Sequence, residues 1–230
     1  MRNESSSQRA AFFDLDNTLI NGSSMYYLFR GLVTKGVLGK KNLIRFGLHN
    51  ARFIKSKEEN LDVMAKVTEI ALGIIGGLHV RTLTSHCEEI VSEFWSHKQN
   101  HGITKRVQEH SEIGDKTWLV TAAPIEIADA VARQLGMSGA IGTRSEVEAG
   151  LYKGKLIGQP LHGVEKAKAI KELATLHGYD LKKSFAYSDS INDLPMLMTV
   201  GKPYAVNPER ELQRIALKNN WPILDTKIPA

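Results

Sequence analysis

Short apolar runs alternate with helical repeats along most of the chain. Four runs have the length and the turn-like boundaries of buried strands: Ala10–Phe13, Thr117–Val120, Ser184–Tyr187 and Gly201–Val206. Helical spacing separates them, from Pro124 to about Leu135 and from Val164 to Leu176, and a glycine follows soon after each helical segment. Strands that alternate with helices predict an α/β fold with a parallel sheet.

Two parts of the chain depart from this alternation. Gly139–Gly158 alternates apolar residues with glycines, which is typical of a hairpin. Residues 21–104 show only helical spacing, and four helices are expected there: one capped by Ser23 or Ser24, and three at Lys41–Lys55, Asn60–Gly73 and Thr82–Gln99. Gly76 and Gly77 predict a break before the last helix. We therefore expect a core of residues 1–20 and 105–230 with a helical insertion at residues 21–104.

Charge is distributed unevenly along the 230 residues, which hold 30 basic and 25 acidic side chains. No Asp or Glu occurs from Asn21 to Lys57, and eight basic residues lie in that stretch: Arg30, Lys35, Lys40, Lys41, Arg45, Arg52, Lys55 and Lys57. No stretch reaches the roughly 20 apolar residues that a membrane span needs. Cys87 is the only cysteine, which excludes an intrachain disulfide and favours a cytoplasmic location.

Polar residues that could act in catalysis or bind a metal ion follow the predicted strands. Asp14 and Asp16 end the first strand, and residues two apart in a strand point the same way. Paired carboxylates suit a hard divalent cation, or a division between nucleophile and acid/base. Thr121 ends the second strand, Lys166 begins a helix, and Asp189 and Asp193 follow the third strand. Ligands of α/β proteins bind at the carboxyl ends of strands, so these side chains are expected to meet.

These four motifs, in this order, resemble those of the haloacid dehalogenase-like hydrolase superfamily. The resemblance is closest to its phosphoserine-phosphatase-like branch, subfamily IB, and covers nearly the whole chain, because residues 21–104 lie where that branch carries its cap. It implies a Rossmann-like parallel-sheet core with a helical cap of the C1 type. It also implies a phosphatase, since dehalogenases lack an aspartate at the position of Asp16.

The resemblance implies a role for each motif residue. Asp14 would attack phosphorus and form an aspartyl-phosphate, and Asp16 would act as acid and then as base. Mg²⁺ would be held by Asp14, the Asp16 backbone carbonyl, Asp189 and water. Thr121 and Lys166 would bind phosphoryl oxygens, and Asn192 could contact the phosphate or the leaving group. Asp193 would orient Lys166 or a metal-bound water.

The substrate is less well indicated. Phosphoserine phosphatases carry a glutamate shortly after the nucleophile motif, but Asn21–Ser24 contains no carboxylate. A buried ammonium would lack its partner, so phosphoserine is only an alternative. The basic Arg30–Lys57 segment and its aromatic residues favour a lipid phosphate or another anionic phosphate, with peripheral contact to an anionic membrane. The same charges could simply form a solvated helix face. A membrane- or nucleic-acid-binding module with a vestigial site is the alternative of another class, with nucleic acid the less favoured partner.

Overall fold

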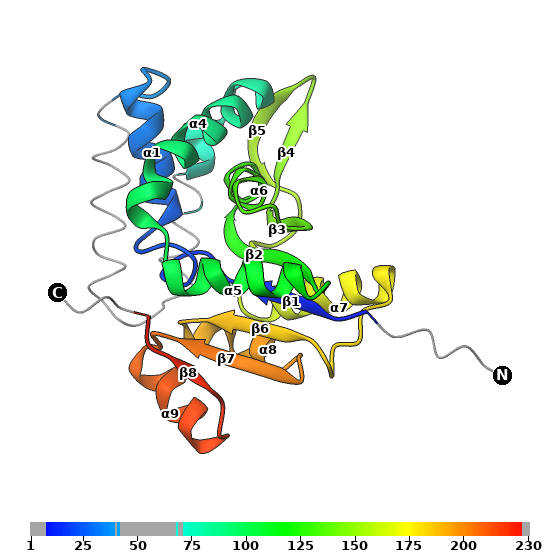
Figure 1. Ribbon diagram of the computed structural model, residues 1–230. Coiled ribbons are helices and arrows are strands. Elements are labelled where there is room, and N and C mark those ends of the chain that lie inside the picture. The colour runs from blue at the N-terminus through cyan, green and yellow to red at the C-terminus, as the bar shows by residue number, and fades with distance from the viewer. Residues whose placement is uncertain (1–7, 40, 42–67, 69–70, 227–230) are drawn as a thin grey trace.

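The protein is described from a computed structural model that covers residues 8–39, 41, 68 and 71–226. A parallel sheet of six strands forms its centre, in the order β3-β2-β1-β6-β7-β8 (Figure 1). The strands are β1 (Ala10–Phe13), β2 (Lys116–Pro124), β3 (Gly139–Thr143), β6 (Phe185–Ser188), β7 (Lys202–Val206) and β8 (Ile223–Leu224). The α/β class with a Rossmann-like sheet is confirmed.

Helices cover both faces of the sheet because both faces are apolar. All four residues of β1 are buried, and alternate residues point to opposite faces. Phe13 packs in a cluster with Val107 and Val131, whereas Phe12 packs in another with Ile170 and Leu197. The first face carries α5 (His101–Glu112) and α6 (Ile125–Gln134), and the second carries α7 (Val164–His177), α8 (Leu194–Leu197) and α9 (Arg210–Lys218).

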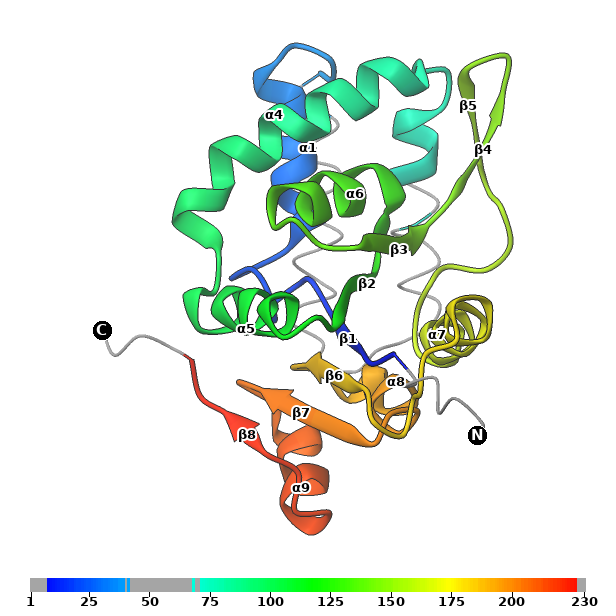
Figure 2. The ribbon, with the colours of Figure 1, turned by 45° about the vertical axis from the view of Figure 1, so that its right-hand side comes forward.

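The helical insertion lies beside the first face, beyond α6 (Figures 1 and 2). Its described helices include α1 (Ser24–Thr34), whose N-terminus is capped by the Ser23 hydroxyl, and α4 (Val80–Lys98). The two helices pack closely, because a Cβ on Gly31 would lie 2.4 Å from a side-chain carbon of Ile90. The Lys35 ammonium joins α1 to α4 through Glu89 and Glu93, at 2.6 and 2.9 Å.

The remaining expectations for the insertion have different outcomes. The helix predicted at Lys41–Lys55 lies outside the described residues except for Lys41, and that at Asn60–Gly73 is described only at Thr68 and residues 71–73, which are helical. The break at Gly76 and Gly77 is confirmed, since both residues form a turn. α5 crosses the expected boundary at residues 104 and 105, and the division into core and cap stays a prediction.

The hairpin prediction for Gly139–Gly158 was wrong in its first part. Residues Gly139–Thr143 form β3, a parallel strand of the main sheet, and the hairpin consists of β4 (Ser145–Glu148) and β5 (Leu151–Leu156). A glycine-interrupted apolar pattern does not distinguish a parallel edge strand from a hairpin arm, because both expose one side. The hairpin is fastened to the insertion by backbone hydrogen bonds, in which Tyr152 accepts from Gly77 and donates to Leu78.

Candidate active site

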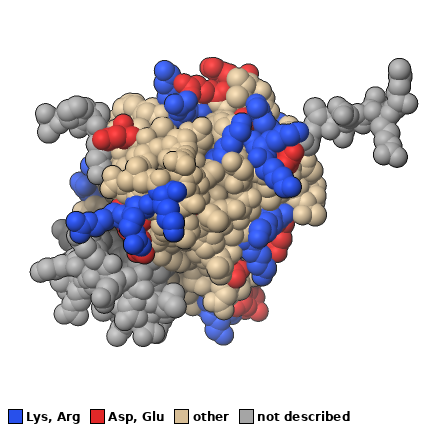
Figure 3. Space-filling model, turned by 90° about the horizontal axis from the view of Figure 1, so that it is seen from below, with Lys and Arg blue, Asp and Glu red and all other residues tan. Residues whose placement is uncertain are grey.

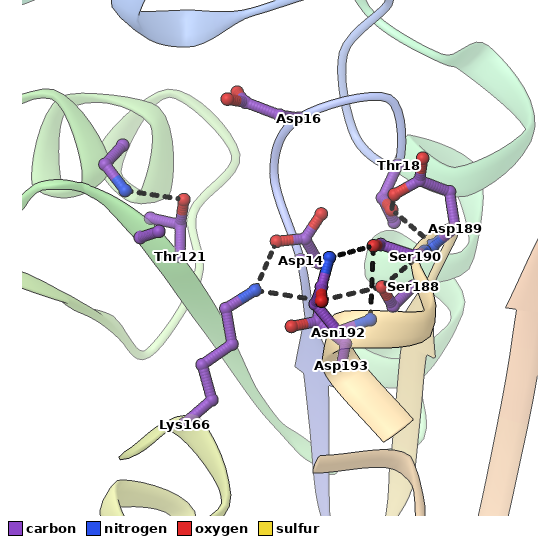
Figure 4. A network of polar contacts seen from close by, with 12 residues as sticks. Asp14, Asp16, Thr18, Thr121, Lys166, Ser188, Asp189, Ser190, Asn192 and Asp193 are labelled. Carbon is purple, nitrogen blue, oxygen red and sulfur yellow. Dashed lines mark hydrogen bonds and ion pairs between the residues drawn. The ribbon is translucent and has the colours of Figure 1, made fainter. Parts of the chain in front are cut away.

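The site forms beyond the ends of β1 and β6 and beside Thr121 of β2. The sequence predicts Thr121 at the end of its strand, but it lies within β2, because β2 continues to Pro124. β1 lies between β2 and β6, so Asp14 at the end of β1 has Thr121 on one side and Asp189 on the other. The Asp14 backbone N–H donates to the Tyr187 carbonyl at 3.0 Å, which extends the ladder between β1 and β6 by one residue. In Figure 4, Lys166 lies between Asp14 and Asp193, whereas Asp16, Thr121 and Asp189 lie farther from the ammonium.

Lys166 links two buried carboxylates at the centre of the site (Figure 4). Its ammonium nitrogen lies 2.6 Å from Asp14 Oδ1 and 2.8 Å from Asp193 Oδ2, and all three side chains are buried. The Ser188 hydroxyl donates a second hydrogen bond to Asp193 Oδ2, at 2.7 Å. Burial opposes the charge on Lys166, but the two carboxylates outweigh it, and the pKa of the ammonium is raised. Lys166 therefore stays charged at the point where a phosphate would arrive.

The carboxylates of the site lack enough positive charge. Burial raises the pKa of Asp14 to about 7, although Lys166 acts in the opposite direction. The pKa of Asp189 is raised to about 8 by burial and by the charges of Asp14 and Asp193. The Lys166 ammonium thus pairs with Asp14 and Asp193, while Asp189 adds a third carboxyl group beside them. A further cation bound here would relieve the repulsion.

The donor set fits Mg²⁺. Asp14 and Asp189 offer hard carboxylate oxygens, and the Asp16 backbone carbonyl would add a third protein ligand. Among the described residues no three His, Cys, Asp or Glu side chains converge as a metal cluster, and the expected shell needs only two side chains. Thr18 positions one of them: its hydroxyl accepts from the Asp189 backbone N–H at 3.1 Å and donates to the Asp189 carboxylate at 3.3 Å.

Asp16 occupies a separate position from Asp14. Its carboxylate points away from the Lys166 ammonium (Figure 4) and accepts a hydrogen bond from the backbone N–H of Ser24, at 2.8 Å. Ser24 is the first residue of α1, so the carboxylate lies at a helix N-terminus, where negative charge is stabilised. Burial nevertheless raises the pKa of Asp16, so this carboxyl group stays protonated to a higher pH than an exposed aspartate does.

Thr121 and Asn192 lie at the edges of the group. The Thr121 hydroxyl oxygen is buried and accepts from the backbone N–H of Ala123 at 3.1 Å. The Asn192 amide donates to the Ser190 hydroxyl at 2.9 Å, within the turn that also carries Asp193. The turn is anchored from outside, because the Glu209 carboxylate accepts from the Ile191 backbone.

Sequence reasoning missed the residues that hold the motif residues in place. Thr18 follows Asp16 by two residues, and this D-x-D-x-T spacing after the first strand is a usable signal. Ser188 and Ser24 gave none, because a hydroxyl beside a motif and a helix-start N–H are common features. Their contacts with Asp193 and Asp16 arise only when the strand ends and α1 meet.

A model of the family described as haloacid dehalogenase-like hydrolase matches residues 11–198. The chain belongs to this family. Phosphoserine phosphatase SerB1 of Mycobacterium tuberculosis is 40% identical over 219 residues, which cover 95% of this chain and 71% of that protein. Histidinol-phosphatase of Neisseria meningitidis is 30% identical, covering 94% of this chain and 98% of that protein. A solved structure of a Bordetella pertussis protein of unknown function is 27% identical, with a TM-score of 0.84, covering 96% of this chain and 100% of that one.

These findings confirm the expectation of a phosphatase of the haloacid dehalogenase-like superfamily. The comparisons favour an enzyme over a binding module with a vestigial site. The structure agrees, because Asp14, Lys166 and Asp193 are all present and form buried ion pairs. Cys87 is buried and the pKa of its thiol is raised by burial, so packing accounts for it.

A second buried polar network supports β6, the strand that Asp189 follows. The His110 ring joins Asp115 and Tyr187, with Nδ1 2.8 Å from Asp115 Oδ2 and Nε2 2.8 Å from the Tyr187 hydroxyl. Arg9 donates to the other Asp115 oxygen at 2.7 Å. Tyr187 stacks on Phe13, the residue before Asp14, with ring centroids 4.6 Å apart. The network thus connects the residues that precede both metal-ligand candidates.

Stability is expected to fall below pH 6.5 through His110. Burial lowers the pKa of His110 from its usual 6.5, so the unfolded chain takes up the proton first. The stabilisation is fully present above pH 6.5 and is lost as the pH falls. Melting temperatures of the wild type and His110→Gln should therefore differ more at pH 7.5 than at pH 5.5. The exposed His101→Gln serves as control, and an equal difference at both pH values would contradict the prediction.

Proposed function

We propose that the chain is a Mg²⁺-dependent phosphatase that hydrolyses a phosphate monoester through an aspartyl-phosphate on Asp14. One observation carries the proposal: the Asp14 carboxylate is held at a strand end by Lys166, at 2.6 Å, beside the Asp189 carboxylate. A carboxylate fixed in this way can attack phosphorus with one oxygen while the other stays bound. The new O–P bond forms as the ester O–P bond breaks.

Asp16 would handle the protons of both steps. Its raised pKa favours the protonated form that donates to the departing alkoxide. The carboxylate that results can then take a proton from the water that attacks the aspartyl-phosphate, which releases phosphate and restores Asp14. The hydrogen bond from Ser24 and the charge of Lys166 act to lower the pKa of Asp16, but burial outweighs both, and no ion pair holds Asp16 in the charged form among the described residues.

Lys166, Thr121 and Asn192 would bind the phosphoryl oxygens, and Asp193 would orient Lys166. The charge of Lys166 is already shared by two carboxylates, so it cannot offset a phosphate dianion alone. Mg²⁺ held by Asp14, the Asp16 carbonyl and Asp189 would supply the missing positive charge and reduce the repulsion between nucleophile and phosphate.

The substrate proposed from the composition is a lipid phosphate or another anionic phosphate ester. Phosphoserine is the second candidate, since the Mycobacterium tuberculosis relative is named phosphoserine phosphatase. Against it, Asn21–Ser24 carries no carboxylate and its two serines are at the start of α1, where Ser23 forms the cap. The relative named histidinol-phosphatase indicates that substrates differ among similar chains.

Membrane contact and a cytoplasmic location stay proposals. In the described part of the chain no helix is long and apolar enough to cross a bilayer. The basic Arg30–Lys57 segment lies mostly outside the described residues, and Lys35 within it is paired with Glu89 and Glu93. On the face shown in Figure 3, the basic side chains of the described residues lie in separate groups, most of them beside acidic ones.

Asp189→Asn is expected to separate metal binding from folding. Because the pKa of Asp189 is raised to about 8, its ionisation reduces stability increasingly as the pH rises towards 8. The metal-free variant should therefore melt at or above the wild-type temperature at pH 8. Mg²⁺ at about 100 times its dissociation constant should stabilise the wild type by about 2.7 kcal/mol but leave the variant unchanged.

The same pair of proteins tests the reaction. The wild type should release phosphate from p-nitrophenyl phosphate only when Mg²⁺ is present. The Asp189→Asn variant should release none, with or without Mg²⁺. The exposed Glu146→Gln on β4 is the control and should behave as the wild type. Absence of turnover by the metal-bound wild type on aryl, alkyl, sugar, nucleotide, amino-acid and lipid phosphates would overturn the proposed function.

A further inference from the structure

An apolar cavity of about 190 Å³ lies beside Asp16, between the insertion and the ends of β2 and β3. The insertion contributes most of the carbon side chains, and the largest of these are Met25, Leu28, Phe29, Leu72, Ile75 and Leu83. The core contributes residues after Thr121, which are Ala122, Ala123 and Pro124. The cavity thus begins at the proposed proton donor and continues away from the phosphate-binding residues.

The described residues that line this cavity carry almost no charge. Among the described lining residues Asp16 is the only charged one, and the other polar groups are the hydroxyls of Ser23, Thr68, Thr143 and Ser145. Two of these hydroxyls already serve the backbone: Ser23 accepts from Tyr26, and Thr143 donates to Ala122 and accepts from Leu161. The described lining residues therefore offer little hydrogen-bonding capacity to a polar group of the substrate.

We propose that this cavity receives the alcohol part of the substrate, and that the enzyme prefers phosphate esters of uncharged, apolar alcohols or phenols. The inference rests on the proposed function, in which Asp16 protonates the leaving oxygen. That oxygen must lie within hydrogen-bonding reach of Asp16, so the first carbons of the alcohol enter the cavity. A carboxylate there would be buried without a partner among the described residues, and an ammonium could pair only with Asp16, the group that must protonate the leaving oxygen. Both features disfavour an amino-acid ester.

The volume of the cavity limits the size of the alcohol part of the ester. A cavity of about 150 Å³ in another protein binds benzene, so 190 Å³ accommodates about six carbons. Each buried methylene is expected to raise kcat/KM about fourfold, since transfer of one CH₂ from water contributes about that factor. The gain should end when the cavity is full.

A series of n-alkyl phosphates from ethyl to dodecyl tests the inference, because the leaving-group basicity hardly changes along the series. We expect kcat/KM to rise about fourfold per carbon up to about six carbons. n-Propyl phosphate, which matches the carbon chain of phosphoserine without its charges, should exceed phosphoserine at least tenfold. A decline beyond about eight carbons would indicate small soluble esters, whereas a plateau through dodecyl would indicate a lipid chain that leaves the cavity at its open end.

Ala71→Leu provides a variant that alters the cavity without touching the reacting groups. Ala71 lines the cavity and is half-buried, so the added carbons fill part of it. The optimum should shift to esters shorter by about two carbons. Ala169→Leu, a half-buried position on α7 outside the lining, is the matched control.

Two results would overturn the inference while leaving the proposed function intact: Mg²⁺-dependent turnover that does not depend on chain length, or phosphoserine as the better substrate. No turnover of any ester would instead refute the proposed function. An Ala71→Leu protein with the wild-type chain-length profile, and with a melting temperature close to that of Ala169→Leu, would also exclude this cavity as the alcohol site.

Discussion

Asp14→Asn is expected to abolish phosphate release while leaving the protein folded. The amide has almost the same shape as the carboxylate and keeps an oxygen for the Lys166 ammonium, which now lies 2.6 Å from Asp14 Oδ1. It is, however, a far weaker nucleophile than a carboxylate. Loss of a nucleophile lowers kcat by roughly three to six orders of magnitude. Phosphate release under saturating Mg²⁺ measures the loss directly.

Chemical trapping shows whether the loss reflects a covalent step. Wild type quenched in acid should carry phosphate from a labelled ester, and hydroxylamine should release it, as expected of an acyl-phosphate. Asp14→Asn should carry none. With p-nitrophenyl phosphate, whose leaving group departs without an acid, Asp16→Asn should accumulate the label, because the second step lacks its base. Asp129→Asn, a carboxyl-to-amide change on α6 outside the site, is the control. Residual activity of Asp14→Asn above about one per cent would assign the nucleophile elsewhere.

Lys166→Met is expected to reduce the free energy of unfolding by about 3–5 kcal/mol, a loss typical of breaking a buried ion pair from one side. Asp14 and Asp193 would remain buried without the cation that they share. In the wild type the Lys166 ammonium nitrogen lies 2.6 Å from Asp14 Oδ1 and 2.8 Å from Asp193 Oδ2. Methionine fills a similar volume, so the loss reports charge rather than a cavity. Urea unfolding at pH 8 without Mg²⁺ provides the measurement, and activity should disappear as well.

The pH dependence identifies the origin of that loss. Both carboxyl groups would gain protons more easily without the ammonium, and a neutral carboxyl group tolerates burial. The difference between wild type and Lys166→Met should therefore shrink as the pH falls from 8 to 5. Lys168→Met, on the same turn of α7 and 66% exposed, should change stability by at most about 0.5 kcal/mol. Equal stabilities of the two variants would contradict a charge-pairing role for Lys166.

Elements with local signals could be predicted well from the sequence. α7 ends at Gly178, which has φ of 71°, a left-handed conformation that glycine adopts without strain. α1 begins where Ser23 can cap it. α9 was missed although Leu212 and Ala216 form a buried stripe, and so was β8, whose two residues are too short to produce a pattern. β3 was misassigned because its parallel partner, β2, lies outside any local window.

The sequence by itself determined which side chains meet, since parallel strands bring their carboxyl ends to one edge of a sheet. The sequence therefore predicts that Asp14, Thr121 and Asp189 lie close together. Only the tertiary structure decided how they are held: Lys166 divides its charge between two carboxylates, and Asp16 turns to the start of α1. The tertiary structure also created the apolar cavity, because its walls come from segments more than 100 residues apart. Packing between such segments leaves no periodic pattern in the sequence from which the cavity could be predicted.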